Sequence, residues 1–122
     1  MSVIKTYRDL LVWQRAMDLA KVVYLSTQAF PKTEQFGLTN QLRRAVVSIA
    51  SNVAEGNGRG STQDYVRFLH IARGSLFESQ TQIDLAQRLA YLSAADALPL
   101  LSLCNEIERM LNTILTKLQV TR

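Results

Sequence analysis

The chain has 122 residues, 48% of them hydrophobic, with a formal net charge of +4 and an isoelectric point near 9.6. This length supports one hydrophobic core but not two, so we expect a single domain over residues 1–122. No apolar run approaches the ~20 residues that a membrane span needs, the N-terminus lacks the apolar stretch of a signal peptide, and Cys104 is the only cysteine. We therefore expect a soluble, cytoplasmic protein without a disulfide.

The first predicted element is an amphipathic helix from about Leu10 to Gln28. At about 100° per residue, its apolar side chains fill about half of the circumference, more than the ~100° stripe that one core needs. The excess indicates either bundle geometry alone or a second contact surface. The apolar side chains are Val12, Trp13, Ala16, Met17, Leu19, Ala20, Val23 and Tyr24.

A second helix is expected over roughly Leu38 to Glu55, with apolar core positions at helical spacing. Residues 54–61 carry three glycines in five positions, so we expect this helix to stop at Gly56 and the glycines after it. The chain then reverses, and Arg59 lies at the tip of the turn. A second stripe of small side chains, which would let a neighbouring helix approach closely, consists of Val47, Ala50 and Ala54.

The third helix is expected to begin at Ser61, where Ser61 and Asp64 resemble a capping box. Val66 and Phe77 project about 100° away from its apolar face. An aromatic side chain there is either a stray exposed residue or part of a subunit contact, and we favour an oligomer interface at Val66 and Phe77. The core positions are Tyr65, Phe68, Leu69, Ala72, Leu76, Ile83, Ala86 and Ala90.

The fourth helix follows Tyr91 and Leu92. Ser93 and Asp96 form a possible cap, but Pro99 would be awkward inside a helix, so we expect the main helix to start at Pro99. Four helices with short connections predict an all-α, antiparallel up-down four-helix bundle.

The residues that could carry catalysis are few. His70 is the only histidine, Cys104 lies in an apolar run typical of a buried small hydrophobe, and neither has an evident companion for a metal site. We therefore expect no enzymatic activity, no metal and no cofactor.

Binding is better supported, because arginines recur along the two central helices. A guanidinium group can pair with a phosphate or a carboxylate, and a basic chain favours acidic partners such as RNA or DNA. The alternatives are an ordinary solvated surface and, for Arg43, pairing with an acid across a helix contact. One continuous patch within a monomer is not assured, although a symmetric oligomer would repeat the set. The candidate nucleic-acid-binding residues are Arg43, Arg44, Arg59, Arg67 and Arg73.

Several motifs resemble a known family. They are Asp9-Leu10-x-Val12-Trp13-Gln14-x-Ala16, Phe30-Pro31, Gly37-Leu38-Thr39-x-Gln41-Leu42-Arg43-Arg44-Ala45, Ala54-Glu55-Gly56, Gly58-Arg59 and Phe68-Leu69-x-Ile71-Ala72-x-Gly74-Ser75. The chain resembles the bacterial four-helix-bundle proteins first noticed as reading frames within intervening sequences of 23S ribosomal RNA genes. These are also similar to the accessory protein of diversity-generating retroelements, a basic homopentamer that works with a reverse transcriptase and nucleic acid.

The resemblance implies a closed homo-oligomer, with a pentamer as the expected state. It also implies that Arg43, Arg44 and Arg59 occupy basic motif positions, and that Gly74 and Ser75 belong to a helix-packing signature. Two functions follow as hypotheses. The first is a homo-oligomeric accessory protein that binds RNA or DNA, and the second is a protein–protein adaptor or scaffold without nucleic-acid binding.

Overall fold

The structure is a computed structural model in which residues 3–120 are described. Within that range the chain forms four α-helices and two short 3-10 turns, and no strand. The 3-10 turns are η1 (Tyr7–Asp9) and η2 (Lys32–Glu34), and the helices are α1 (Leu11–Thr27), α2 (Leu38–Gly58), α3 (Thr62–Arg88) and α4 (Ala94–Val120). None of the helices in this range combines the length and the apolar character needed to cross a membrane.

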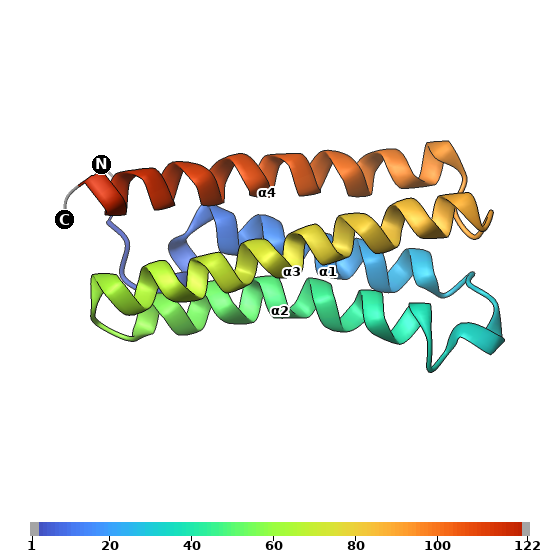
Figure 1. Cartoon of the computed structure of the whole chain (residues 1–122), viewed down its shortest axis with the longest axis horizontal. Helices are drawn as coiled ribbons and strands as arrows, with labels where there is room; N and C mark the ends of the chain where they lie inside the picture. Colours follow the sequence, from blue (N-terminus) through green and yellow to red (C-terminus); the bar gives the residue numbers. More distant parts are fainter. Residues whose placement is uncertain (1–2, 121–122) are drawn as a thin grey trace.

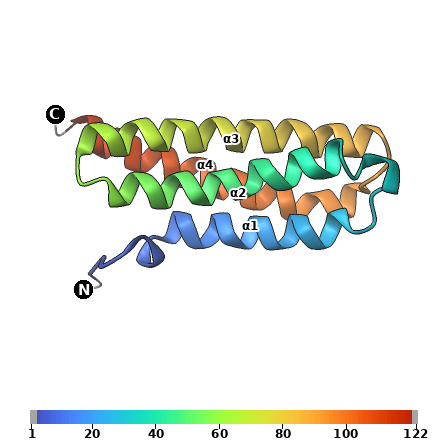
Figure 2. The same ribbon diagram turned by 90° about the horizontal axis from the view of Figure 1, so that it is seen from below.

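The four helices lie side by side along the long axis of the molecule (Figure 1). The α1–α2 and α3–α4 connections lie at one end and the α2–α3 turn lies at the other, as the second view confirms (Figure 2). Each helix packs against two others: α1 and α3 both contact α2 and α4. The predicted four-helix bundle is therefore confirmed.

The core is a continuous column of aliphatic side chains from all four helices. Each helix contributes positions three and four residues apart, which is the spacing that turns one face inward. Burying one such side chain stabilises the fold by about 1.5–3 kcal/mol. The largest fully buried side chains are Val23, Leu19, Leu42, Val46, Ile49, Val53, Leu69, Leu76, Ile83, Leu100, Ile107 and Leu111.

The end of α2 lies within the predicted glycine-rich stop. The helix continues past Glu55 to Gly58, and the chain reverses at Gly60, whose φ is +83°. Gly56 lies inside α2 at the point where this helix comes close to Phe68 and Tyr65 of α3. A Cβ at this position would lie 2.6 Å from Cβ of Phe68 and 3.2 Å from Cδ1 of Tyr65. Only a residue without a side chain lets the two helices come this near.

The start of α4 differs from the prediction. The helix begins at Ala94 and contains Pro99, and Ser93 accepts a hydrogen bond from the Asp96 backbone N–H at 3.0 Å. The proline lacks the N–H that would bond to the carbonyl of Ala95. Ala95 and Pro99 are both exposed, so water can satisfy that carbonyl and the helix continues. The other predicted cap is confirmed, since Ser61 accepts from the Asp64 N–H at 3.1 Å.

Two connections meet at one end of the bundle. The Glu34 carboxylate accepts hydrogen bonds from the Leu38 N–H at 3.0 Å and from the Tyr91 hydroxyl at 2.9 Å. The rings of Tyr91 and Phe30 are 5.5 Å apart, which joins the α1–α2 link to the α3–α4 turn. These bonds lower the pKa of Glu34, and the same carboxylate raises the pKa of Tyr91.

Ala90, predicted as a core position, lies in the α3–α4 turn, is exposed and has a φ of +63°.

Candidate nucleic-acid interface

Arg43 on α2 is held by the C-terminal end of α1. Its Nε donates to Oγ1 of Thr27 at 2.8 Å and its Nη2 donates to the Tyr24 carbonyl at 3.3 Å. The guanidinium carbon also lies 4.7 Å from the centre of the Tyr24 ring. The sequence allowed an acid as partner, but the groups present are a hydroxyl, a carbonyl and a ring. Arg43 therefore adds donors to the hydroxyl and carbonyl oxygens at the C-terminal end of α1.

Arg44 has different surroundings. Its side chain is exposed, and no hydrogen bond or ion pair involves it among residues 3–120. All five guanidinium donors are therefore directed to solvent and open to a ligand.

Arg59 and Arg67 come together at the opposite end of α2. The guanidinium carbon of Arg59 lies 5.0 Å from the centre of the Phe68 ring, and that of Arg67 lies 4.5 Å from the same centre. Each also pairs with an acid one turn away: Arg59 with Glu55 at 3.2 Å and Arg67 with Asp64 at 3.7 Å. All four charged side chains are largely exposed, so each ion pair contributes about 0–1 kcal/mol.

Phe68 is the member of this cluster that sequence reasoning missed. It was expected only as a core residue, and it is 6% exposed. The two guanidinium groups lie over the ring, a cation–π arrangement, while both arginine side chains stay about half exposed to water. The sequence signal was the Arg67–Phe68 neighbourhood, but the approach of Arg59 depends on how the turn folds back.

A shallow hollow of about 180 Å³ adjoins this cluster at the α2–α3 turn. The first turn of α3 opens toward solvent here, and helix N-termini attract anions through their free N–H groups. The hollow is lined by Gly56, Asn57, Gly60, Ser61, Thr62 and Tyr65.

Arg73 faces α4 from the middle of α3. Its Nη1 donates to Oδ1 of Asn112 at 2.8 Å, and its Nη2 lies 3.0 Å from Nδ1 of His70. Because a guanidinium group only donates, Nδ1 of His70 is the acceptor. Arg73 therefore links α3 to α4, and His70, one turn away on α3, accepts its second hydrogen bond.

The five arginines do not form one patch within the monomer. Arg43 and Arg59 are 16 residues apart on α2, which is about 24 Å along a helix. Arg59 and Arg67 form one pair at the α2–α3 turn, Arg44 lies near the other end, and Arg43 and Arg73 are engaged by neighbouring helices. Arg44, Arg59 and Arg67 are therefore the accessible members of the set.

The two residues predicted at an oligomer interface differ in exposure. Phe77 is 44% exposed, whereas Val66 is partly buried against the core. A second apolar surface lies between α1 and α2, where the wide apolar face of α1 meets the small-residue stripe of α2. This groove of about 370 Å³ is lined by Tyr7, Trp13, Met17, Ala20, Val47, Ala50, Ser51 and Ala54.

The groups that could carry other chemistry lie apart. His70 is exposed beside Arg73, and Cys104 is fully buried. Burial, followed by the negative charges of Asp84 and Glu108, raises the pKa of the Cys104 thiol to about 12. In the described part of the chain, no three histidine, cysteine or carboxylate side chains are grouped to hold a metal ion.

Residues 8–113 match the family described as 23S rRNA-intervening sequence protein. The chain belongs to this family. The match covers the basic positions Arg43, Arg44 and Arg59 and all but the last turns of α4. Ser75 of the expected packing signature does lie at a helix contact, with Oγ 2.9 Å from Oγ of Ser48 on α2, whereas Gly74 is exposed and a Cβ there would meet nothing within 4 Å.

No curated protein matches this family member. A similar solved structure is the 1.70 Å crystal structure of a protein with unknown function from the S23 ribosomal protein family of Bacteroides thetaiotaomicron VPI-5482. The two chains superpose with a TM-score of 0.78 at 23% identity, over 86% of this chain and 98% of that chain. This likeness shows a common fold, and neither description names a reaction.

Proposed function

We propose that this family member is a non-enzymatic binding protein that contacts RNA or DNA through Arg44, Arg59 and Arg67. The observation that carries the proposal is the pairing of Arg59 and Arg67 on the Phe68 ring at an exposed turn. The buried Phe68 ring holds both guanidinium groups near one another before phosphate binds. This lowers the entropy cost of ordering the two arginine side chains on binding. Their weak ion pairs with Glu55 and Asp64 can be exchanged for contacts with phosphate.

The protein is proposed to act as a homo-oligomer of antiparallel bundles, with the pentamer of the resembling proteins as the expected state. Repetition around a symmetry axis would multiply three accessible arginines into a ring of positive charge. Phe77 supports an interface on α3, because its exposed aromatic ring keeps apolar surface in contact with water. A second copy packed on α3 would remove that surface from water.

A test of nucleic-acid binding is fluorescence anisotropy with labelled structured RNA, single-stranded DNA and duplex DNA across a salt series. We expect binding that weakens steeply with salt, because each phosphate contact releases a counterion. The triple variant Arg44→Gln, Arg59→Gln, Arg67→Gln should weaken binding at least tenfold and flatten the salt slope. The matched variant Arg88→Gln, on an exposed arginine outside this set, should bind as the wild type does. Undetectable or salt-independent binding would contradict the proposal.

The second candidate is a protein–protein adaptor, which the groove between α1 and α2 favours. Met17 is 45% exposed and Val47 is 42% exposed on its rim, so a partner helix would bury apolar area there. Pull-down from nuclease-treated extract separates the two functions. A protein retained by the wild type and by Leu98→Glu, but lost with Met17→Glu, supports the adaptor.

A further inference from the structure

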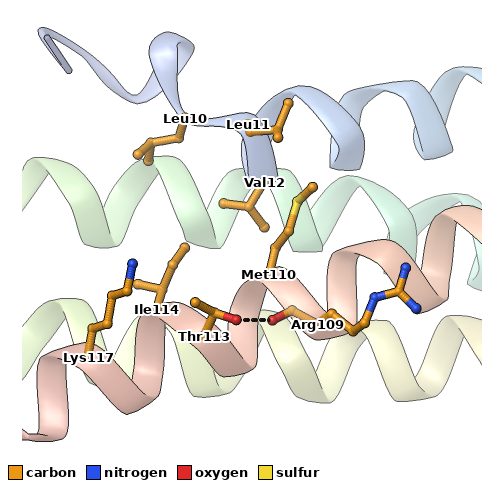
Figure 3. Close-up of a pocket in the computed structure, with 8 residues that line it drawn as sticks. All are labelled: Leu10, Leu11, Val12, Arg109, Met110, Thr113, Ile114 and Lys117. Atoms are coloured by element: carbon orange, nitrogen blue, oxygen red, sulfur yellow. Dashed lines mark hydrogen bonds between the residues drawn. The ribbon is translucent and has the colours of Figure 1, made fainter. Parts of the chain in front are cut away.

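A second apolar groove, between the beginning of α1 and the end of α4, is not used by the proposed function. It holds about 420 Å³ and is lined by the eight residues drawn in Figure 3: Leu10, Leu11, Val12, Arg109, Met110, Thr113, Ile114 and Lys117. The groove forms because α1 begins only at Leu11, while the preceding turn η1 packs against α1 and α2. The last turns of α4 are therefore left with a partly open flank.

The walls of the groove are aliphatic. Leu10, Leu11 and Val12 form the side on α1, and Met110 and Ile114 form the side on α4 (Figure 3). Leu11 is 49% exposed, so its apolar surface meets water in the absence of a ligand. The lining contains no aromatic ring on which a base could stack and no acid. It suits a slender apolar chain rather than a nucleotide.

Two cations flank this apolar surface on α4. Arg109 and Lys117 are eight residues apart, about 12 Å along the helix. Both are exposed, and among residues 3–120 neither forms an ion pair. Thr113, between them, donates its hydroxyl to the Arg109 carbonyl at 2.9 Å, so its only donor is already used. The polar groups that remain open to a ligand at the rim are therefore two positive charges.

This placement contrasts with the other charged positions on the same flank of the bundle. Arg15 on α1 pairs with Glu106 on α4 at 2.9 Å, which neutralises the next turns of the α1–α4 contact. Nearer the open groove, Arg109 and Lys117 form no such ion pair among residues 3–120. A ligand with one negative charge and an apolar body would pair with a cation at the rim and would cover the exposed apolar side chains of the groove.

We propose that the groove binds a free medium-chain fatty acid. The carboxylate pairs with Lys117, whose amine lies beside Ile114 in Figure 3, and the alkyl chain runs along Ile114 and Met110 against Leu10 and Leu11. Arg109, about 12 Å away along α4, lies at the other end of the groove, beside the methyl end of the chain, and keeps that rim free of negative charge. This site is separate from Arg44, Arg59 and Arg67, so its failure and that of nucleic-acid binding can be told apart.

The test is isothermal titration calorimetry of the full chain with dodecanoate, below the concentration at which it forms micelles. We expect one dodecanoate per chain and weaker binding of decanoate and octanoate, with up to about a fifteenfold loss for each pair of methylenes removed. Dodecanol, with the same tail and no charge, should bind more weakly than dodecanoate. Dodecyltrimethylammonium, with the opposite charge, should not bind the site.

A charge-reversed pair of variants supplies the control. Arg109→Glu with Lys117→Glu should lower dodecanoate affinity at least tenfold, because an acid then replaces the amine that pairs with the carboxylate and a second negative charge flanks the groove. Lys21→Glu with Arg88→Glu makes the same change in net charge at exposed positions outside the groove and should keep the wild-type affinity. Circular dichroism checks that both double variants remain folded.

Two results would overturn the proposal. The first is no saturable binding of dodecanoate to the wild type, and the second is an equal loss of affinity in the two double variants. If the first result comes with a change of oligomeric state on reversing Arg109 and Lys117, the groove belongs to an interface with a second copy of this chain.

Discussion

Arg43 and Arg44 are adjacent in sequence, yet they have different roles in the structure. Arg43 donates to Thr27 and to the Tyr24 carbonyl, and its guanidinium lies over the Tyr24 ring. Arg44 points to solvent without a partner among residues 3–120. Adjacent helical residues project about 100° apart, so one turns toward α1 while the other turns away. An arginine pair in a motif therefore need not act as a pair.

This difference predicts opposite effects of one substitution at the two positions. Arg43→Leu should lower the free energy of unfolding by about 1.5–3 kcal/mol, because it leaves the Thr27 and Tyr24 oxygens without their charged donor. Arg44→Leu should change it by no more than about 0.5 kcal/mol, as expected for an exposed side chain. Urea denaturation followed by circular dichroism measures both. Equal losses at the two positions would contradict the assigned contacts.

At the scale of elements, the contact between α2 and α3 depends on the absence of one side chain. Gly56 lies within α2, directly against Phe68 and Tyr65 of α3. This close approach is also what brings Phe68 beneath Arg59, so the packing of two helices positions the arginine pair of the proposed interface. Gly74, in the middle of α3, faces open space and has no such role.

Alanine substitution at the two glycines should therefore change stability in opposite directions. Gly56→Ala should lower the free energy of unfolding by about 1–3 kcal/mol, because its Cβ would collide with Phe68 and the helices would have to separate. Gly74→Ala should raise it by about 0.5–1 kcal/mol, since alanine favours a helix where nothing opposes the methyl group. Thermal and urea unfolding of both variants are the measurements. Stabilisation by Gly56→Ala would show that the contact is looser than described.

The hydrogen bond between the Tyr91 hydroxyl and Glu34 predicts a dependence of stability on pH at the end of the bundle. The pKa of Glu34 is lowered, first by the Leu38 N–H and then by the Tyr91 hydroxyl, so its stabilisation is present above the unfolded pKa and is lost as pH falls through the folded pKa. The pKa of Tyr91 is raised, so its stabilisation is present below the unfolded pKa and is lost as pH rises through the folded pKa.

We expect wild-type stability to fall more than that of Glu34→Gln as the pH is lowered from about 5 to about 3, since the amide cannot be protonated in this range. Tyr91→Phe should be less stable than wild type at pH 7, and the gap should close above about pH 10 as Tyr91 ionises. Urea denaturation across pH measures both, and urea avoids the screening that guanidinium would add. Parallel pH profiles for wild type and both variants would contradict the contact.

At the scale of the whole molecule, the exposed apolar side chains are spread over several faces. Phe77 on α3, Met17 and Val47 at the α1–α2 groove, and Leu11 at the α1–α4 groove are each more than 40% exposed. A closed ring built from a single chain type uses two different faces of each copy, so more than one apolar surface is compatible with the proposed oligomer.

Assembly is therefore expected to respond to a charge at Phe77. Phe77→Glu should shift the particle mass toward the monomer, because it places a carboxylate in an interface where it has no partner. Leu98→Glu, at a residue that is 68% exposed on the first turns of α4, is the matched control and should leave the mass unchanged. Light scattering coupled to size-exclusion chromatography measures both. An unchanged mass for Phe77→Glu would move the interface elsewhere.

The amino-acid sequence by itself determined the four helices, most of their inward faces, the serine caps at Ser61 and Ser93, and the family. These features follow from local rules, because a periodicity of 3.6 and a capping side chain act within a few residues of one another. Only the tertiary structure decided that α2 continues past Gly56, that Pro99 lies inside α4, and that Arg43 is engaged while Arg59 and Arg67 share Phe68. It also decided that a groove flanked by Arg109 and Lys117 opens beside Leu11. Each of these depends on the rotation and axial position of one helix against another, and local periodicity contains no information about either.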